Sequence, residues 1–294
     1  MRKKILLVTA LYGRHDLTRI ILAYYAELKR GFDMELLCVG SEGDRSRQLA
    51  EAWGWKYIEF PNAPLSQKFN ALFDESQHYD YDFMVLIGSD DLISPEVFQY
   101  YEHTVTANTR YLLGLKDLYF YSIQKQHCIH FQGYPSPPSP HTIGAGRVFS
   151  RWIMEQMNFR PWNNERVNRG LDSSCTAQLR KKRIDEIAVP MELTRGIAVD
   201  IKHPLVTLTK YDLLIDKHPQ VDASVLDRFH CMPAIKSLRW VQDFNPLKMY
   251  TVKVIDPQRK DFGQVRQIQG KALVDSLVQE KMEIIWSECT NLVP

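Results

Sequence analysis

The sequence predicts an α/β protein built on a mostly parallel, doubly wound sheet. Two continuous apolar runs of strand length, residues 5–10 and 83–87, and the mostly apolar run 34–39 are each followed by a segment of helical character. Apolar strands without polar alternation are typical of a sheet that is covered on both faces. Regular alternation of strands and helices indicates parallel strands joined by crossover helices.

Local signals define the elements of the first half of the chain. Asp16 is predicted to cap the first helix, whose apolar residues recur on one face. Ser94 and Pro95 are the expected N-cap and first residue of a later helix. In order, we expect strand 5–10, helix 16–28, strand 34–39, helix 45–53, strand 55–60, helix 65–73, strand 83–87 and a helix from residue 95.

The pattern changes after residue 111, where predicted strands follow one another through short connections. The proline-rich segment 135–140 is expected to be a surface loop, because proline cannot donate a hydrogen bond within a helix or a central strand. The other expected elements are strands 112–115, 119–123 and 128–131, helices 151–157 and 172–182, a strand at 249–255 and a largely helical stretch at 265–286.

The composition is that of an ordinary folded protein. The 294 residues, 45% hydrophobic and 24% charged, are enough for one large domain with an appendage. The formal net charge of +2 gives no whole-molecule argument for binding to nucleic acid or membranes. We expect a main domain at residues 1–214, divided into halves 1–110 and 111–214, followed by a mixed α/β extension at 215–294.

The five cysteines are isolated from one another and include no CxxC pair. Their odd number argues against a disulfide framework or a cysteine-rich zinc site, so a reducing, cytoplasmic location is expected. No segment approaches the roughly 20 apolar residues of a membrane-spanning helix. The short apolar run after Arg2, Lys3 and Lys4 is interpreted as the first strand rather than as a signal peptide.

Two adjacent carboxylates, Asp90 and Asp91, follow the apolar strand at residues 83–87. In open α/β sheets, ligands bind at the carboxyl edge of the strands. Neighbouring carboxylates repel each other unless a cation lies between them, and oxygen ligands suit Mg²⁺ or Mn²⁺. The alternative is that the pair only opens a turn and caps the helix that follows Ser94.

The residues around this pair resemble the GT-A glycosyltransferases, particularly the family-2-like group. Ser89, Asp90 and Asp91 match the acidic motif that ends the family's fourth strand. The resemblance covers residues 4–214 and rests on the order and spacing of five further segments. These are 8–14 in the first-strand loop, 62–70 before the metal motif, 142–147 with its glycines, 170–172 at a helix start and 200–203 on the donor side.

The resemblance implies a nucleotide-diphosphate sugar as donor, bound by the half at residues 1–110, and Mn²⁺ or Mg²⁺ as cofactor. Because Ser89 brings no carboxylate to the motif, Asp91 is assigned the direct metal contact and Asp90 a ribose or outer contact. His203 is the candidate third metal ligand, and Glu42 stands in for the aspartate that usually meets the nucleotide base. The donor-binding candidates are Thr9, Ala10, Tyr12, Arg14, Glu42, Lys68, Asn70 and Asp90.

On the acceptor side, the resemblance implies that Asp172 is the general base of an inverting transfer. A base of this kind must reach the acceptor hydroxyl from the face opposite the leaving diphosphate. The alternative is that Asp172 only stabilises the positive end of a helix. Arg147 and Trp152 are the candidate acceptor-binding residues. The basic run at 180–183 is interpreted as a solvated helix end, with contact to a polyanion as the alternative.

Two other function classes remain open from the sequence. A sugar-1-phosphate nucleotidyltransferase shares this kind of sheet, but the single Gly13 after the first strand differs from the glycine-rich phosphate loop expected there. A non-catalytic nucleotide-sugar-binding module is the second alternative. The acceptor of a transferase is left open among a saccharide, a glycolipid, a protein and a hydroxymethylated base in DNA.

Overall fold

A computed structural model describes residues 2–134, 142–162, 168, 170–203 and 211–238, together with the backbone of three strands between 249 and 284. Contacts divide the chain into two compact units, Met1–Leu238 and Arg239–Pro294. Each unit is described by itself. The proline-rich segment 135–140 lies outside the described residues.

The first unit contains a seven-stranded sheet of order β10-β6-β9-β4-β1-β2-β3. All neighbouring strands are parallel except β9, which runs antiparallel to β4 and β6. The mostly parallel α/β sheet predicted from the sequence is therefore confirmed. Its strands are β1 (Lys4–Ala10), β2 (Asp33–Gly40), β3 (Lys56–Glu59), β4 (Phe83–Gly88), β6 (Tyr111–Leu115), β9 (Arg147–Ser150) and β10 (Asp185–Val189).

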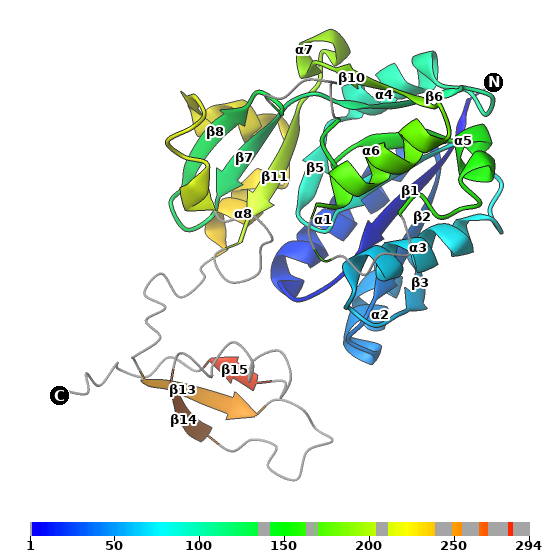
Figure 1. Ribbon diagram of the computed structural model, residues 1–294. Coiled ribbons are helices and arrows are strands. Elements are labelled where there is room, and N and C mark those ends of the chain that lie inside the picture. The colour runs from blue at the N-terminus through cyan, green and yellow to red at the C-terminus, as the bar shows by residue number, and fades with distance from the viewer. Residues whose placement is uncertain are drawn as a thin grey trace. The chain divides into compact units, whose positions relative to one another are not determined.

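Helices cover both faces of this sheet (Figure 1). On one face, Leu6 and Val8 of β1 join a core cluster with residues of α3 (Leu65–Ser76), α5 (Arg151–Gln156) and α6 (Leu171–Lys181). Ile5 and Leu7 alternate with them and are equally buried. This two-sided burial explains why the strand is apolar without alternation.

On the other face lie α1 (His15–Leu28) and α4 (Pro95–Thr104), joined by the edge-to-face contact of Tyr25 with Phe98. Helix α2 (Asp44–Glu51) packs beside β3. Helix α1 begins after Arg14, whose backbone is left-handed with φ 38°, and Asp16 lies in the first turn. The prediction that Asp16 caps this helix is wrong, because the chain turns sharply at Gly13 and Arg14 before it becomes helical.

A second, five-stranded sheet has the order β12-β8-β7-β11-β5. The chain leaves the first sheet at the end of β4 and enters the second sheet at Asp91, so Ser89 and Asp90 connect the two. Three residues are too few for a sequence pattern, and β5 was not expected as a strand. The strands are β5 (Asp91–Ile93), β7 (Leu118–Ser122), β8 (His127–Phe131), β11 (Ala198–Lys202) and β12 (Gln220–Val221).

Short helices complete the first unit. Phe229 packs edge-to-face on Tyr24 of α1, with ring centroids 5.7 Å apart, so this later segment belongs to the same core. The division expected after residue 214 stays a prediction about domains, while the contacts divide the chain after Leu238. The short helices are η1 (Lys29–Gly31), α7 (Met191–Thr194), η2 (Tyr211–Leu213), η3 (Ala223–Arg228) and α8 (Met232–Ser237).

The second unit contains a three-stranded antiparallel sheet of order β14-β13-β15. Its strands are β13 (Met249–Val254), β14 (Val265–Gln269) and β15 (Met282–Ile284). The strand expected at 249–255 is present. The largely helical stretch expected at 265–286 is wrong where it is described, because hydrogen bonds to β13 hold both ends of that stretch in extended form.

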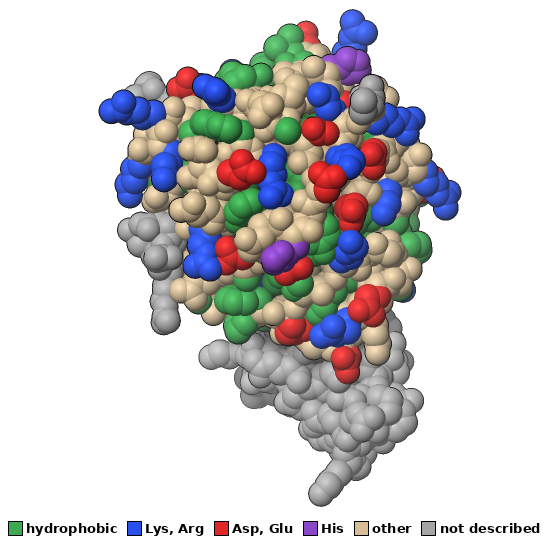
Figure 2. Space-filling model, turned by 90° about the vertical axis from the view of Figure 1, so that its right-hand side faces the viewer, with side chains coloured by type: hydrophobic (Ala, Val, Ile, Leu, Met, Phe, Trp, Pro, Cys, Tyr) green, Lys and Arg blue, Asp and Glu red, His purple; other side chains and the backbone are tan. Residues whose placement is uncertain are grey.

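Lysines and arginines are interspersed with acidic residues on the face of the molecule in Figure 2, without a patch of one sign. Within the described ranges, no helix combines the length and the apolar character needed to cross a membrane. Cys38, Cys128, Cys175 and Cys231 are buried and free.

Lys68 of α3 joins three loops at the carboxyl edge of the first sheet. Its fully buried ammonium group donates to the Leu11 carbonyl at 2.7 Å, to Ser41 Oγ at 3.0 Å and to Asn62 Oδ1 at 3.0 Å. These residues follow β1, β2 and β3. Burial lowers the pKa of Lys68 to about 8, against the raising effect of Glu42 and Glu59. An ammonium with three internal acceptors acts as a clamp between loops, not as the free cation expected for donor phosphates.

We expect Lys68→Met to lower the free energy of unfolding by about 2–4 kcal/mol, because three acceptors lose a charged donor in a buried place. Urea unfolding followed by circular dichroism measures the change. Lys56→Met is the matched control, since Lys56 is more than half exposed and pairs with Glu35 on the surface. Equal losses in the two variants would contradict the clamp.

Candidate functional site

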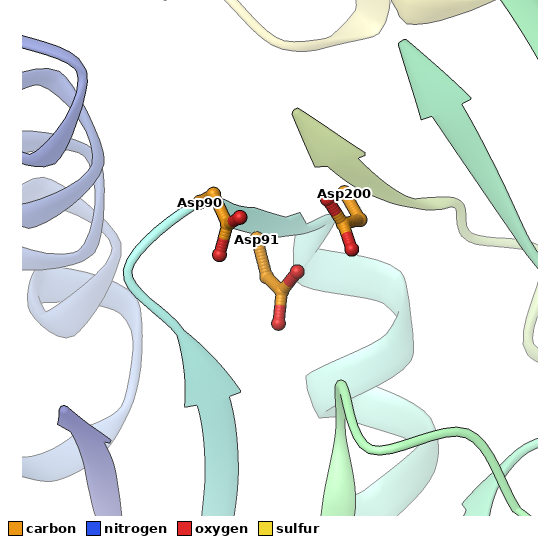
Figure 3. A group of neighbouring side chains, drawn as sticks. All are labelled: Asp90, Asp91 and Asp200. Carbon is orange, nitrogen blue, oxygen red and sulfur yellow. The ribbon is translucent and has the colours of Figure 1, made fainter. Parts of the chain in front are cut away.

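Three carboxylates meet where the two sheets join. Asp90 lies in the connection after β4, Asp91 is the first residue of β5, and Asp200 of β11 is paired with Asp91 in the antiparallel register. One oxygen from each lies within 4.8 Å of the others. Figure 3 shows Asp90 and Asp91 at the β4–β5 junction, with Asp200 beside them.

Gly88 allows this arrangement because it has no side chain. Its N–H donates to Asp91 Oδ2 at 2.5 Å, which turns the Asp91 carboxylate back over the end of β4. A Cβ atom on Gly88 would lie 2.7 Å from Asp90 Oδ1 and 2.9 Å from Asp91 Oδ2. Both carboxylates therefore occupy the space that any other residue at position 88 would fill.

The cluster is electrostatically costly when all three groups are ionised. Burial, followed by the charges of Asp200 and Asp90, raises the pKa of Asp91 well above its usual value. Burial also raises the pKa of Asp200 to about 6, although Lys202 opposes the shift. Asp200 Oδ1 is buried without a hydrogen-bond partner in the described part of the chain. Oxygen ligands at this spacing, one of them unsatisfied, fit a hard divalent cation such as Mg²⁺ or Mn²⁺.

Two side-chain cations flank the carboxylates. The Arg14 guanidinium lies 2.6 Å from Asp90 Oδ2 and 3.1 Å from Ser89 Oγ. The Lys202 ammonium lies 2.6 Å from Asp200 Oδ2 and 4.5 Å from the centre of the Phe120 ring. Asp91, between them, makes no ion pair with a described residue. Arg14 and Lys202 therefore lie beside the place where the cluster would bind a ligand. The Lys68 ammonium is instead hydrogen-bonded to loops of the protein.

The loops after β1 and β2 are fastened together by Glu42. Its Oε2 accepts from the Gly13 N–H at 3.0 Å and from Ser46 Oγ at 3.1 Å, and lies 3.1 Å from His15 Nε2. Burial raises the pKa of Glu42, but His15 and these hydrogen bonds outweigh it, and the net shift is downward. Glu42 is thus an ionised carboxylate. Its Oε1 is buried and has no hydrogen-bond partner among the described residues, and the contact of Glu42 with a nucleotide base stays a prediction.

The other donor-side candidates differ in exposure. Tyr12 is exposed, and the centre of its ring lies 5.9 Å from the Lys68 ammonium. Ala10 ends β1 and is partly buried. Thr9 is fully buried in β1, between β2 and β4. Asn70 exchanges two hydrogen bonds with the backbone of Trp162, so its amide holds that segment rather than a donor.

His203 does not belong to the carboxylate cluster. Burial and the charge of Arg14 lower the pKa of His203 to about 3, so the imidazole is neutral. It follows the last residue of β11, whereas Asp200 is paired with Asp91 inside the strand. The structure places Asp200 where the sequence prediction had placed His203, and the ligand role of His203 stays a prediction.

Asp172 lies in the first turn of α6, on the other side of the site. Its Oδ2 accepts from the Tyr134 hydroxyl at 2.7 Å, and its Oδ1 is 3.8 Å from Arg147 Nη1. Asp172 Oδ1 lies over Gly144, where a Cβ atom would come within 2.8 Å. The charge of Asp200 also acts on the Tyr134 hydroxyl. Tyr134 is thus the hydrogen-bond partner of Asp172 and lies within range of the charge of Asp200.

Arg147 is fully buried at the start of β9 and acts within the protein. It donates to Thr142 Oγ1 and to the Thr142 carbonyl, both at 2.9 Å, and approaches Glu186 at 3.4 Å. Its remaining donors point to the backbone carbonyl of Asp172. The guanidinium positions the start of α6. The sequence prediction of direct acceptor binding by Arg147 does not fit this burial.

Trp152 lies at the opposite edge of the first sheet from Asp90 and Asp91. Strand β9 runs antiparallel to β4, so Arg147 is paired with Leu86 near the carboxyl edge and Ser150 with Phe83 at the other edge. Trp152 follows Ser150 in α5 and packs against the core and Arg110. The predicted acceptor contact of Trp152 does not fit this position, which follows from a strand direction that the sequence did not show.

Sequence reasoning missed Asp200, Lys202 and Tyr134 as site residues. Asp200 and Lys202 are two residues apart on β11, a spacing that places both on one face of a strand. This signal was available in the sequence. Pairing of Asp200 with Asp91 and the contact of Tyr134 with Asp172 join segments more than 35 residues apart, and only the tertiary structure shows them.

Comparisons with known proteins give a similarity of architecture. The mannosyltransferase PcManGT from Pyrobaculum calidifontis, solved with GDP-Man and Mn²⁺, is 14% identical over 84% of this chain and 68% of its own, with a TM-score of 0.47. GalNAc-T7, solved with UDP, GalNAc and Mn²⁺, is 7% identical over 69% of this chain and 44% of its own, with a TM-score of 0.46. The inositol-1-phosphate CTP transferase from T. maritima is 10% identical over 81% and 98%, with a TM-score of 0.47.

No known family and no curated protein matches the sequence. Because the TM-scores of these structures are below 0.5, the case for a function rests on the side chains of this chain.

We expect Gly88→Ala to leave the fold intact and to weaken Mn²⁺ binding by about tenfold or more. The new methyl group displaces the ends of two flexible side chains, Asp90 and Asp91, rather than backbone. Isothermal titration with Mn²⁺ measures the affinity. Gly31→Ala is the control, since no atom lies within 4 Å of its Cβ position. Unchanged Mn²⁺ affinity in Gly88→Ala would contradict the cluster as the metal site.

We expect Arg14→Gln to strengthen the binding of Mn²⁺ alone and to weaken the binding of pyrophosphate in its presence, each by about threefold to tenfold. Arg14 neutralises Asp90 in the free protein and is a suitable partner for phosphate oxygens once a metal replaces it. Free Mn²⁺ measured by electron paramagnetic resonance gives both affinities. Arg19→Gln on the same helix is the control, because its pair with Asp16 is exposed.

Proposed function

We propose that this protein is a metal-dependent, inverting glycosyltransferase that moves a sugar from a nucleotide-diphosphate sugar to an acceptor hydroxyl. The observation that carries the proposal is the meeting of Asp90, Asp91 and Asp200 at the carboxyl edge of the sheet, with one further carboxylate, Asp172, held by the Tyr134 hydroxyl. Open α/β sheets bind ligands at this edge. The carboxylate cluster is suited to a metal ion and Asp172 to proton transfer, so the two acidic groups have separate roles.

The donor half consists of the loops after β1 and β2 and the carboxylate cluster. The loops are fastened by Glu42 and Lys68, so the exposed Tyr12 is held in a fixed position for a nucleotide. Asp90, Asp91 and Asp200 would hold Mn²⁺ or Mg²⁺, and the ion would supply Lewis-acid neutralisation of a diphosphate. Arg14 leaves Asp90 and binds a phosphate oxygen, which adds a second positive charge to the leaving group.

On the acceptor side, Asp172 accepts the proton of the acceptor hydroxyl. As it loses this proton, the acceptor oxygen attacks the anomeric carbon from the face opposite the diphosphate. The bond between the anomeric carbon and the diphosphate oxygen breaks, and its electrons pass to that oxygen. Inversion follows from attack on the opposite face. The Tyr134 hydroxyl holds Asp172 Oδ2, and Arg147 fixes the backbone at the start of α6, so the base is oriented before the acceptor arrives.

A sugar-1-phosphate nucleotidyltransferase is the second candidate, because a carboxylate cluster also suits a metal that activates a nucleoside triphosphate. That reaction releases pyrophosphate and needs no base for an acceptor hydroxyl. The contacts that orient Asp172 therefore favour the glycosyltransferase. The acceptor classes compatible with this proposal are a saccharide, a glycolipid, a protein and a modified DNA base.

The test begins with nucleotide-sugars incubated with Mn²⁺, with release of nucleoside diphosphate as the readout. We expect turnover with one nucleotide-sugar, loss of turnover and of Mn²⁺ binding in Asp91→Asn, and a fall of about 10²–10⁴ in kcat with donor affinity retained in Asp172→Asn. Nuclear magnetic resonance of the product anomer reads the inversion.

Asp44→Asn is the matched control for Asp172→Asn. Asp44 also lies in the first turn of a helix, but its side chain is largely exposed. A similar loss of turnover in Asp44→Asn would indicate that Asp172 acts only by stabilising the start of its helix. Pyrophosphate release from a nucleoside triphosphate and a sugar-1-phosphate, without release of diphosphate from any nucleotide-sugar, would replace the proposal with the nucleotidyltransferase.

A further inference from the structure

A continuous series of side-chain contacts joins the carboxylate cluster to Asp172. Lys202, paired with Asp200, covers the Phe120 ring at 4.5 Å. Phe120 contacts Phe131 with centroids 5.5 Å apart, and Phe131 meets Tyr134 edge-to-face at the same distance. Tyr134 then donates to Asp172. Three aromatic rings thus lie between the group that holds the metal and the proposed base.

The register of the second sheet explains why these rings face the cluster. Asp91 is paired with Asp200, Asp200 with Phe120, and Phe120 with Ile129. Paired residues of neighbouring strands project from the same face of a sheet, so carboxylates and rings form one row across β5, β11, β7 and β8. Phe131, two residues from Ile129, extends the same face.

This row has a solvent-accessible aromatic surface. Phe120 is half-buried and Tyr134 is exposed, whereas Phe131 is buried and supports both. We name Phe120, Phe131 and Tyr134 the aromatic platform. Polar groups border it at both ends, with the Lys202 ammonium at one and the Tyr134 hydroxyl and Asp172 at the other.

We infer that the aromatic platform binds the acceptor and that the acceptor presents a pyranose ring. This inference rests on the proposed function, because Asp172 and the cluster are the two points between which an acceptor hydroxyl must lie. One face of a pyranose carries C–H groups of slightly positive charge, which suit the negative faces of aromatic rings. Its hydroxyls require the polar groups at the border of the platform. A lipid chain offers no hydrogen bonds to these polar groups.

The charge around the platform supports an uncharged sugar. Asp172, Asp200, Asp90 and Asp91 outnumber the nearby cations Lys202, Arg14 and Arg147, and each of these cations is already paired with a carboxylate. Once the metal and the donor diphosphate neutralise each other, one negative charge remains in excess among these groups. A polyanionic acceptor such as single-stranded DNA meets repulsion there.

The test uses saturation-transfer nuclear magnetic resonance on the full chain with Mn²⁺ and pyrophosphate present. The probes are methyl β-D-glucopyranoside, methyl β-D-galactopyranoside and methyl α-D-mannopyranoside, with deoxycytidine as a planar probe. We expect saturation of the C–H face of at least one glycoside, and about tenfold weaker binding of it in Phe120→Ala. Tyr134→Phe keeps the ring, so glycoside affinity is retained while the orientation of Asp172, read as kcat, is lost.

Tyr119→Ala is the matched control, because Tyr119 is the neighbour of Phe120 on β7 but packs on His130 from the opposite face. Binding of deoxycytidine alone, of none of the three glycosides, or equal losses in Tyr119→Ala and Phe120→Ala would each overturn the inference. Mn²⁺ binding that depends on Asp91 is measured in the same samples. Its absence overturns the proposed function, whereas its presence without glycoside binding overturns only the platform.

Discussion

The repulsion among three carboxylates at the junction of two sheets is the constraint on which the rest of the site depends. Neighbouring buried acids favour proton uptake or a cation, and the pKa values of Asp91 and Asp200 are both raised. The fold holds the groups together against this repulsion. The Tyr25 hydroxyl of α1 donates a hydrogen bond to the Asp91 carbonyl and accepts one from the Ile93 N–H. These two bonds hold β5 in place. Gly88 then leaves the space that the carboxylates occupy.

The positively charged residues divide into two kinds because of where their backbones lie. Lys68 and Arg147 arise from elements covered by other elements, so their donors are used by loops and helix ends within the protein. Arg14 and Lys202 lie beside the carboxylate cluster and pair with its members. Ion pairs of this second kind can be exchanged for a ligand that offers the same charge. Internal clamps of the first kind cannot be released without opening the loops they join.

The two sheets contribute different halves of the proposed reaction. The first sheet presents loops whose separation is fixed by Glu42 and Lys68, a suitable frame for a nucleotide. The second sheet presents one continuous face that runs from Asp91 and Asp200 to the aromatic platform. Because β5 follows β4 after only two residues, Asp90 and Asp91 belong to both halves. A donor and an acceptor bound to separate sheets would meet at this junction.

The sequence by itself determined the α/β class, the mostly parallel sheet and the acidic pair at the end of β4. Burial on both faces requires continuous apolar strands, and this pattern can be recognised in a short stretch of consecutive residues. Tertiary structure alone decided that Asp200 joins the pair, that Trp152 lies at the far edge, and that Lys68 and Arg147 are internal. These outcomes depend on strand direction, on register and on the burial of long side chains. Each arises from contacts between segments far apart in the chain, which local periodicity does not encode.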